Sequence, residues 1–206
     1  MSEPRDTAGA TGGAVGVNLS ARPPAQPIFY YDLGSPACYL VAERIMSELP
    51  VAPEWEPVLG TQIGGTVRDL DRARLELLGA EQGLQALRWP SRWPPESRTA
   101  MLAATYAKRV GRAVAFSLAA YRQAFAGARD LDDRDTVLIA AAACEIHPAA
   151  LLKGIGLRSV AARLERAGAR ALEAGVRSLP AITVDGLLFE GDGGLERAAS
   201  ALGARR

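Results

Sequence analysis

The residue with the clearest potential for chemistry is a serine at a predicted helix start. Ser35 follows a run of strand-forming residues and a turn, and Pro36 after it is typical of the first turn of a helix. A hydroxyl beside the N–H groups of a helix N-terminus can stabilise a bound anion, including a thiolate. The same serine could act only as the helix N-cap, so both roles remain open.

Thiol and imidazole groups are few, with two cysteines and one histidine in the chain. Cys38 lies behind Ser35 in the same predicted helix and Cys144 ends an apolar run, so both are expected to be buried thiols of low reactivity. His147 precedes a proline at a helix junction, where capping is favoured over catalysis. No metal-ligand cluster, phosphate-binding glycine-rich loop or dinucleotide-binding fingerprint occurs in the sequence, which therefore predicts no metal.

The elements that must position Ser35 form a strand, a helix and a second strand. Residues 28–31 are strand formers closed by a turn at residues 32–34. A helix is predicted from Ser35 to about Leu49, and residues 54–59 alternate in the manner of a second strand. This order is typical of a βαβ unit.

A helical block and a terminal hairpin follow this unit. Helices are predicted over Val67–Leu87, Arg98–Val110, Ala113–Phe125, Asp133–Glu145, Pro148–Gly154 and Ser159–Ala174. The proline-rich stretch Trp89–Pro95 is predicted as a loop whose two tryptophans either line a pocket or, as we favour, pack beneath the loop. Strands at 181–184 and 187–189 flank an Asp-Gly turn, and a helix over 195–202 ends the chain. The sequence therefore predicts an α/β, thioredoxin-like fold with an inserted helical subdomain.

Length and charge limit the classes of partner. The 206 residues can form one sizeable core, and 24 basic against 23 acidic residues provide no field to attract nucleic acid or an anionic membrane. Because no apolar run spans a membrane and residues 1–26 lack the features of a signal peptide, we expect a cytoplasmic protein. Residues 1–26 are predicted to be a disordered tail, 27–60 and 158–204 the thioredoxin-like domain, and 61–157 the helical insertion.

Two segments carry a resemblance to a known family. Residues 29–40, Phe-Tyr-Tyr-Asp-Leu-Gly-Ser-Pro-Ala-Cys-Tyr-Leu, resemble the first strand and active-site helix of DsbA-like proteins. Residues 177–181, Arg-Ser-Leu-Pro-Ala, resemble their second signature, in which a cis-proline faces the helix N-terminus. The resemblance covers about residues 27–201 and implies that the Leu179 backbone, before Pro180, can pair with an extended thiol peptide.

The resemblance also implies which chemistry is lost. The redox members carry Cys-x-x-Cys, which places Ser35 at the attacking cysteine and Cys38 at the resolving one. Since disulfide exchange requires a thiolate, a dithiol oxidoreductase is not expected. Residues 35–40 are instead similar to kappa-class glutathione transferases and 2-hydroxychromene-2-carboxylate isomerases. In that branch Ser35 would be the catalytic residue that stabilises the thiolate of glutathione or another low-molecular-weight thiol, with Leu179 and Pro180 binding this cofactor.

The turn before the last helix departs from that branch. The Gly-x-Asp-Arg turn, whose acid helps to hold the γ-glutamyl amine there, is replaced by Gly-Asp-Gly-Gly at residues 191–194. Asp192 lies one position earlier and is assigned as a third cofactor-binding residue, or alternatively as a cap of the helix. Arg68 and Arg98, the basic candidates of the helical block, are interpreted as solvated.

Two functions from different classes follow. The favoured one is a thiol-dependent isomerase or transferase, in which a small thiol binds across Ser35 and the Leu179-Pro180 edge and its sulfur adds to a small electrophilic substrate. A homodimer is left open. The alternative is a DsbA-fold binding protein without catalytic or disulfide oxidoreductase activity, because fold analogy alone cannot separate the two.

Overall fold

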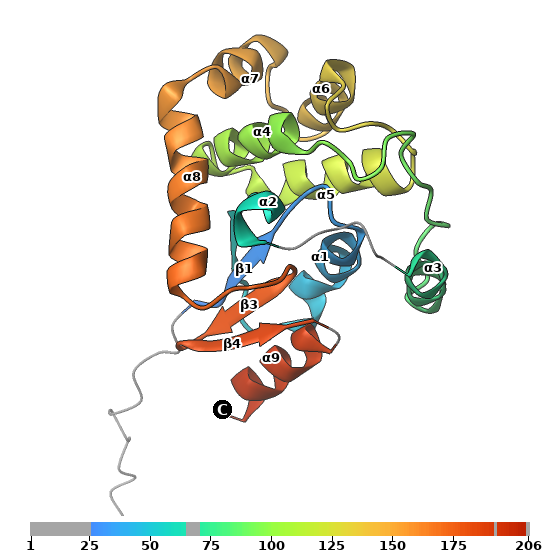
Figure 1. The fold of residues 1–206 in the computed structure, drawn as a ribbon, viewed down its shortest axis with the longest axis vertical. Helices are drawn as coiled ribbons and strands as arrows, with labels where there is room; N and C mark the ends of the chain where they lie inside the picture. The colour runs from blue at the N-terminus through green and yellow to red at the C-terminus, as the bar shows by residue number, and fades with distance from the viewer. Residues whose placement is uncertain (1–25, 65–70, 192, 205–206) are drawn as a thin grey trace, which may run out of the picture.

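The computed structural model describes residues 26–64, 71–191 and 193–204, which fold around one four-stranded sheet (Figure 1). Its strands are β1 (Ile28–Tyr31), β2 (Glu54–Pro57), β3 (Ala181–Val184) and β4 (Leu187–Glu190), in the order β2-β1-β3-β4. β1 pairs in parallel with β2 and antiparallel with β3, and β3 pairs antiparallel with β4. β1 and β2 are the two strands of the predicted βαβ unit, and β3 and β4 form the predicted hairpin. The thioredoxin-like α/β fold is therefore confirmed.

The helices lie at or near the predicted positions. They are α1 (Pro36–Glu48), α2 (Gly60–Ile63), α3 (Arg72–Glu81), α4 (Arg98–Arg109), α5 (Ala113–Phe125), α6 (Arg134–Ala142), α7 (Pro148–Ile155), α8 (Arg158–Glu173) and α9 (Gly194–Gly203). Only the short α2 was not predicted, because the second strand was expected to continue to residue 59, where Leu59 is instead the N-cap of α2. The predicted tail, apart from Gln26, lies outside the described residues.

The helix predicted over Val67–Leu87 is too long at its C-terminal end. α3 ends at Glu81, while residues 65–70 lie outside the described part of the chain. Gly83 has a φ of 69°, the left-handed conformation that commonly ends a helix. The apolar periodicity continues past this glycine, and for that reason the pattern alone extended the helix too far.

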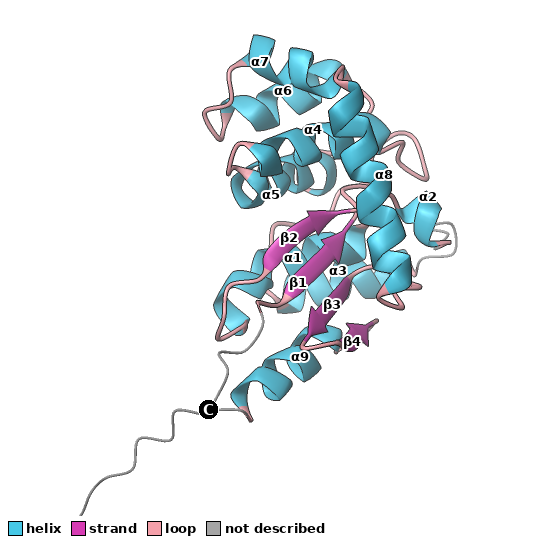
Figure 2. Cartoon of the chain, turned by 90° about the vertical axis from the view of Figure 1, so that its left-hand side faces the viewer, coloured by secondary structure: helices cyan, strands magenta, loops and turns pink. Residues whose placement is uncertain are grey.

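Alternate residues of β1 divide the core between the two faces of the sheet. Phe29 and Tyr31 are buried in the larger cluster, with α1, α9 and the helical block, and Phe29 meets Trp55 edge-on at 5.1 Å between ring centroids. Tyr30 points to the opposite face and packs in a smaller cluster with residues of α8 such as Ala171. The sheet is therefore covered on both faces, as the side view shows (Figure 2).

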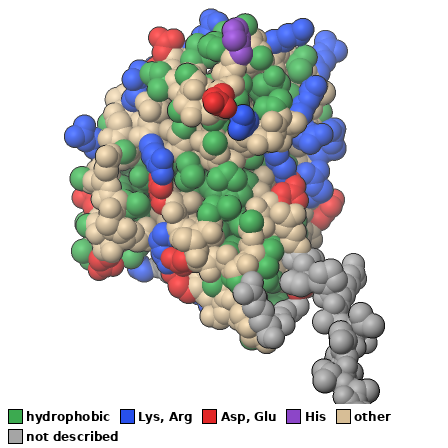
Figure 3. Space-filling model, turned by 180° about the vertical axis from the view of Figure 1, so that it is seen from behind, with side chains coloured by type: hydrophobic (Ala, Val, Ile, Leu, Met, Phe, Trp, Pro, Cys, Tyr) green, Lys and Arg blue, Asp and Glu red, His purple; other side chains and the backbone are tan. Residues whose placement is uncertain are grey.

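Four of the helices between β2 and β3, α4 to α7, gather at one end of the molecule, and α8 leads the chain back along the sheet (Figure 1). The division into a thioredoxin-like domain and an insertion stays a prediction. No helix in the described part of the chain is long and apolar enough to cross a membrane. On the face shown in Figure 3, acidic and basic side chains are interspersed around a central apolar area.

Candidate functional site

Ser35 is the N-cap of α1, where the turn after β1 ends. Its backbone is extended, with φ −98° and ψ 115°, and its Oγ accepts a hydrogen bond from the Cys38 N–H at 3.2 Å. Pro36 follows in the first turn of the helix, and Ser35 itself is only 7% exposed. Because Oγ acts as the acceptor in this bond, its own O–H is a donor that can be directed at the Cys38 thiol or at a bound group. The N-cap role is present, and donation to a ligand is compatible with it.

Asp32 organises the turn that leads into α1. Its Oδ1 accepts from the Gly34 N–H at 2.8 Å, its Oδ2 accepts from the Gly60 N–H at 2.6 Å, and the Ser97 side chain also hydrogen-bonds to it. Burial raises the pKa of the Asp32 carboxyl, and these donors act in the opposite direction. Sequence reasoning assigned Asp32 to the turn only, since nothing in the spacing pointed to Gly60 as its partner.

The two cysteines and the histidine lie as expected. Burial raises the pKa of the Cys38 thiol to about 12, and its hydrogen bond with Ser35 acts in the opposite direction. Cys38 therefore stays protonated at neutral pH and lacks the thiolate that disulfide exchange requires. Cys144 is also a buried free thiol. His147 caps α7, accepting the Ala149 N–H at Nδ1 over 3.2 Å, and α7 lies at the end of the molecule away from the sheet (Figure 1).

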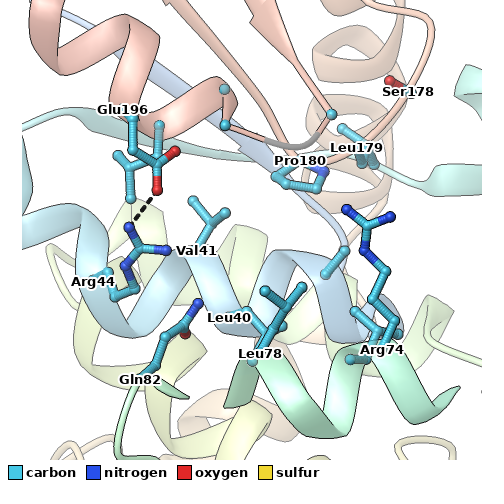
Figure 4. A pocket seen from close by; sticks show the side chains of 16 residues that line it. Leu40, Val41, Arg44, Arg74, Leu78, Gln82, Ser178, Leu179, Pro180 and Glu196 are labelled. Carbon is cyan, nitrogen blue, oxygen red and sulfur yellow. Dashed lines mark hydrogen bonds and ion pairs between the residues drawn. The ribbon is translucent and has the colours of Figure 1, made fainter. Parts of the chain in front are cut away.

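A pocket of about 340 Å³ opens between α1, α3, the loop before β3 and the start of α9 (Figure 4). Leu179 and Pro180 line it from the loop, and the peptide bond between them is cis. Ala37 lines it from the first turn of α1. Five of the other lining side chains are apolar, those of Leu40, Val41, Leu75, Leu78 and Leu195, and five are polar or charged, those of Arg44, Arg74, Gln82, Ser178 and Glu196. A concave, largely apolar site of this size with a few polar groups is typical of small-molecule binding.

Charged side chains stand at the border of this pocket. Arg44 of α1 donates to Glu196 of α9 at 2.5 Å and forms two further hydrogen bonds with Glu48. The bond with Arg44 holds the pKa of Glu196 below its ordinary value. Arg74 of α3 extends toward Pro180 on the other side of the pocket (Figure 4). In the described part of the chain no three His, Cys, Asp or Glu side chains are placed to hold a metal ion.

Of the four residues that the sequence assigned to the site, the structure places two, Leu179 and Pro180, in the lining of the pocket. Leu179 and Pro180 line the same pocket as Ala37 of the first α1 turn. Ser35 precedes Ala37 at this end of α1, but it is not among the residues that line the pocket. Asp192 lies outside the described residues, although glycines on both sides of it line the pocket.

Sequence reasoning missed the contribution of α3. Arg74, Leu75 and Leu78 line the pocket from this helix, opposite α1. The sequence analysis predicted a helix over this region, but the pattern carried no information about what that helix would contact. Of the basic residues assigned to solvent, Arg98 is exposed, and Arg68 lies outside the described residues.

The tryptophans of the proline-rich loop pack against each other instead of lining the pocket. Trp89 and Trp93 meet edge-on with 5.2 Å between ring centroids. The Arg72 guanidinium lies 4.7 Å from one ring centre and 4.8 Å from the other, and Trp89 donates to Glu76 at 2.6 Å. The favoured interpretation, packing beneath the loop, agrees with these contacts, which connect the loop to α3.

The sheet order, the inserted helices and a cis-proline loop beside the first turn of α1 define the class of a thioredoxin-like fold with a helical insertion. The chain belongs to the DSBA-like thioredoxin domain family, whose pattern matches residues 28–203. A search of the curated proteins finds no significant match.

Solved structures with similar folds include enzymes of two kinds. A 2-hydroxychromene-2-carboxylate isomerase aligns with a TM-score of 0.77 and 16% identity, over 86% of this chain and 94% of that one. A probable DsbA oxidoreductase from Streptomyces coelicolor has a TM-score of 0.69 and 18% identity, over 87% and 89%. The cytosolic disulfide reductase DsbM from Pseudomonas aeruginosa, in a structure with GSH, has a TM-score of 0.60 and 15% identity, over 87% and 95%. At these identities the likeness shows the fold alone.

Proposed function

We propose that this chain binds a low-molecular-weight thiol, glutathione or a related one, and acts with it as an isomerase or transferase on a small electrophilic substrate. The observation that carries the proposal is the position of the α1 N-terminus next to the pocket beside the cis-proline. The α1 N-terminus, capped by a serine hydroxyl in place of a cysteine thiol, adjoins a pocket that the cis Leu179-Pro180 edge also lines. The homodimer and the cytoplasmic location stay predictions from the sequence, and the proposal does not depend on either.

The pocket fits such a cofactor in size and in its polar groups. Its volume of about 340 Å³ falls in the range of small-molecule sites. Arg74 is a cation suited to a carboxylate of the thiol compound, and the Leu179 backbone offers the edge of an extended strand. When bound, the thiol supplies the nucleophilic sulfur that the chain itself lacks, because Cys38 is buried and protonated.

Ser35 would lower the pKa of the bound thiol. Its O–H can donate to a thiolate while its Oγ still accepts the Cys38 N–H. The positive end of the α1 dipole favours the same charge. Among the similar folds, DsbM is described with GSH, and the isomerase shows that this architecture occurs outside disulfide chemistry.

One observation favours the alternative, a binding protein without chemistry. Ser35 is only 7% exposed and already has a complete N-cap hydrogen bond, so it needs no ligand to account for its presence. The decisive question is whether Ser35 changes the pKa of a thiol in the pocket.

The experiment is a titration with glutathione and other cellular thiols, following the thiolate absorbance of the bound compound as the pH is varied. A hydrogen bond to a charged group contributes roughly 1.5–3 kcal/mol, so Ser35→Ala should raise the pKa of the bound thiol and slow turnover about ten- to a hundredfold. Ser35→Thr, which keeps the hydroxyl, should retain part of the effect.

Ser47→Ala is the matched control, because Ser47 lies on the same helix and its hydroxyl donates to the Arg44 carbonyl at 2.8 Å. It should leave the thiol pKa unchanged. If Ser35→Ala costs only the roughly 1 kcal/mol of stability of a lost N-cap, and the thiol pKa does not move, Ser35 is a helix cap alone. If the wild type binds no thiol, the binding-protein alternative is correct.

A further inference from the structure

The loop that leads to the cis-proline is attached to the neighbouring strand by a single carboxylate. Glu190 is the last residue of β4 and is paired in register with Ala181 of β3. Its Oε1 accepts hydrogen bonds from the backbone N–H groups of Arg177 and Ser178, each at 2.7 Å. Hydrogen bonds to an ionised acceptor are shorter and stronger than neutral ones. Glu190 therefore holds two consecutive residues of this loop.

Glu190 is also fixed from the other side. The Arg197 guanidinium of α9 donates to the Glu190 backbone carbonyl at 2.7 Å. The segment before β3 lines the pocket through Ser178, Leu179 and Pro180. The segment after β4 lines it through glycines and the first turn of α9. Glu190 thus stands between two walls of one pocket, although it does not itself line the pocket.

The Arg177 side chain also supports this loop, because its guanidinium donates to the Leu172 and Val176 carbonyls at 3.0 and 2.8 Å. Arg177 and Ser178 are both exposed, and Leu179 is half-buried. These contacts hold the loop at Arg177 and leave the backbone that follows to Glu190. Without the Glu190 carboxylate, the Ser178 N–H would face water, and a ligand would have to order this segment on binding. Sequence reasoning did not single out Glu190, because its partners lie on the far side of the hairpin.

We propose that Glu190 is a positioning residue for the thiol site: its carboxylate fixes the Arg177 and Ser178 backbone so that Leu179 and Pro180 present a preformed edge to the ligand. This inference rests on the proposed function. In this proposal Glu190 increases the affinity for the thiol compound, whereas Ser35 lowers the pKa of the bound thiol. The two residues should therefore separate in a measurement that reports both quantities.

The experiment compares Glu190→Ala and Glu190→Gln with the wild type, using glutathione as the probe. Glu190→Ala should raise the Kd for glutathione about tenfold, which corresponds to the loss of one well-formed interaction. The pKa of the bound thiol should be unchanged. Glu190→Gln keeps an oxygen that can accept both N–H groups, so it should restore most of the affinity. Glu173→Ala, an exposed carboxylate on α8 outside the pocket lining, is the control and should match the wild type.

Amide hydrogen exchange provides the second readout. In Glu190→Ala the Arg177 and Ser178 amides should exchange at least tenfold faster, while amides of β1 keep their wild-type rates. An unchanged Kd in Glu190→Ala, or unchanged exchange at both amides, would overturn the inference. If the wild type does not bind glutathione and the two amides still exchange faster in the variant, the proposed thiol function fails while the attachment of the loop by Glu190 stands.

Discussion

Asp32 shows how one buried side chain can determine the geometry of a site that it does not enter. Its two carboxylate oxygens accept N–H groups from different segments, one from the turn before Ser35 and one from the start of α2. The residue is 7% exposed, so water does not replace a lost partner. The orientation of Ser35 thus depends on a residue with no direct role in the proposed chemistry.

Asp32→Asn should lower the free energy of unfolding by about 1–3 kcal/mol, the cost of a buried donor left unsatisfied. The asparagine side chain offers one oxygen, and its NH₂ group would face the second N–H donor. Urea unfolding followed by circular dichroism measures this change. Asp133→Asn is the control, because Asp133 is an exposed N-cap of α6, where asparagine caps equally well. Equal stability of both variants would show that the Asp32 carboxylate is not needed as a double acceptor.

At the scale of elements, the helical block depends on a close approach between α4 and α7. Gly154 of α7 faces the Tyr106 ring of α4, and a Cβ on this glycine would lie 2.3 Å from the ring Cδ2. An aromatic ring cannot move aside as a flexible side chain does, so the small residue sets the distance between these helices. No residue of α7 lines the pocket beside the cis-proline. A change in the packing of α7 can therefore be tested without changing the lining of the proposed site.

Gly154→Ala should therefore lower the Tm, although alanine is the better helix former. Overpacking costs about 1–3 kcal/mol, against a gain of about 1 kcal/mol in helix propensity. Gly203→Ala is the matched control, since a Cβ at that position of α9 would meet no atom within 4 Å apart from its own helix backbone and chain neighbours. It should be neutral or slightly stabilising. A Gly154→Ala protein as stable as Gly203→Ala in thermal unfolding would mean that α4 and α7 separate without cost.

At the scale of the whole molecule, a group of charges joins the helical block to the edge of the sheet. Lys108 of α4 donates to Glu54 at 2.7 Å and to Glu56 at 2.8 Å, both on β2. Arg170 of α8 lies 3.4 Å from Glu56, which is 8% exposed. Because Glu56 is so well buried, its charge is tolerated only with these partners.

Lys108→Met should destabilise the protein by roughly 1–3 kcal/mol, less than the cost of an entirely unpaired buried charge because Arg170 remains. It should also weaken the coupling between sheet and helical block. The check is urea unfolding followed by two probes, far-UV circular dichroism and tryptophan fluorescence, whose transitions coincide in a two-state protein. Lys153→Met, at an exposed position on α7, should change neither the midpoint nor the coincidence. A Lys108→Met midpoint equal to that of this control would show that the charges do not connect the two parts.

The sequence alone determined the features that depend on neighbouring residues. The Ser35 N-cap, the His147 cap and the Asp-Gly turn between β3 and β4 involve groups a few positions apart, so local chemistry decides them. Helix and strand periodicity likewise predicted most of the elements and, through their order, the thioredoxin-like fold.

Only the tertiary structure decided which surfaces meet. The pairing of Asp32 with Gly60, the attachment of the cis-proline loop to Glu190, and the wall that α3 adds to the pocket all join segments distant in sequence. A periodic pattern shows which face of a helix is apolar, but the partner of that face follows from how the whole chain packs. The proposed catalytic serine could therefore be identified from its local signature, whereas the residues that shape its site could not.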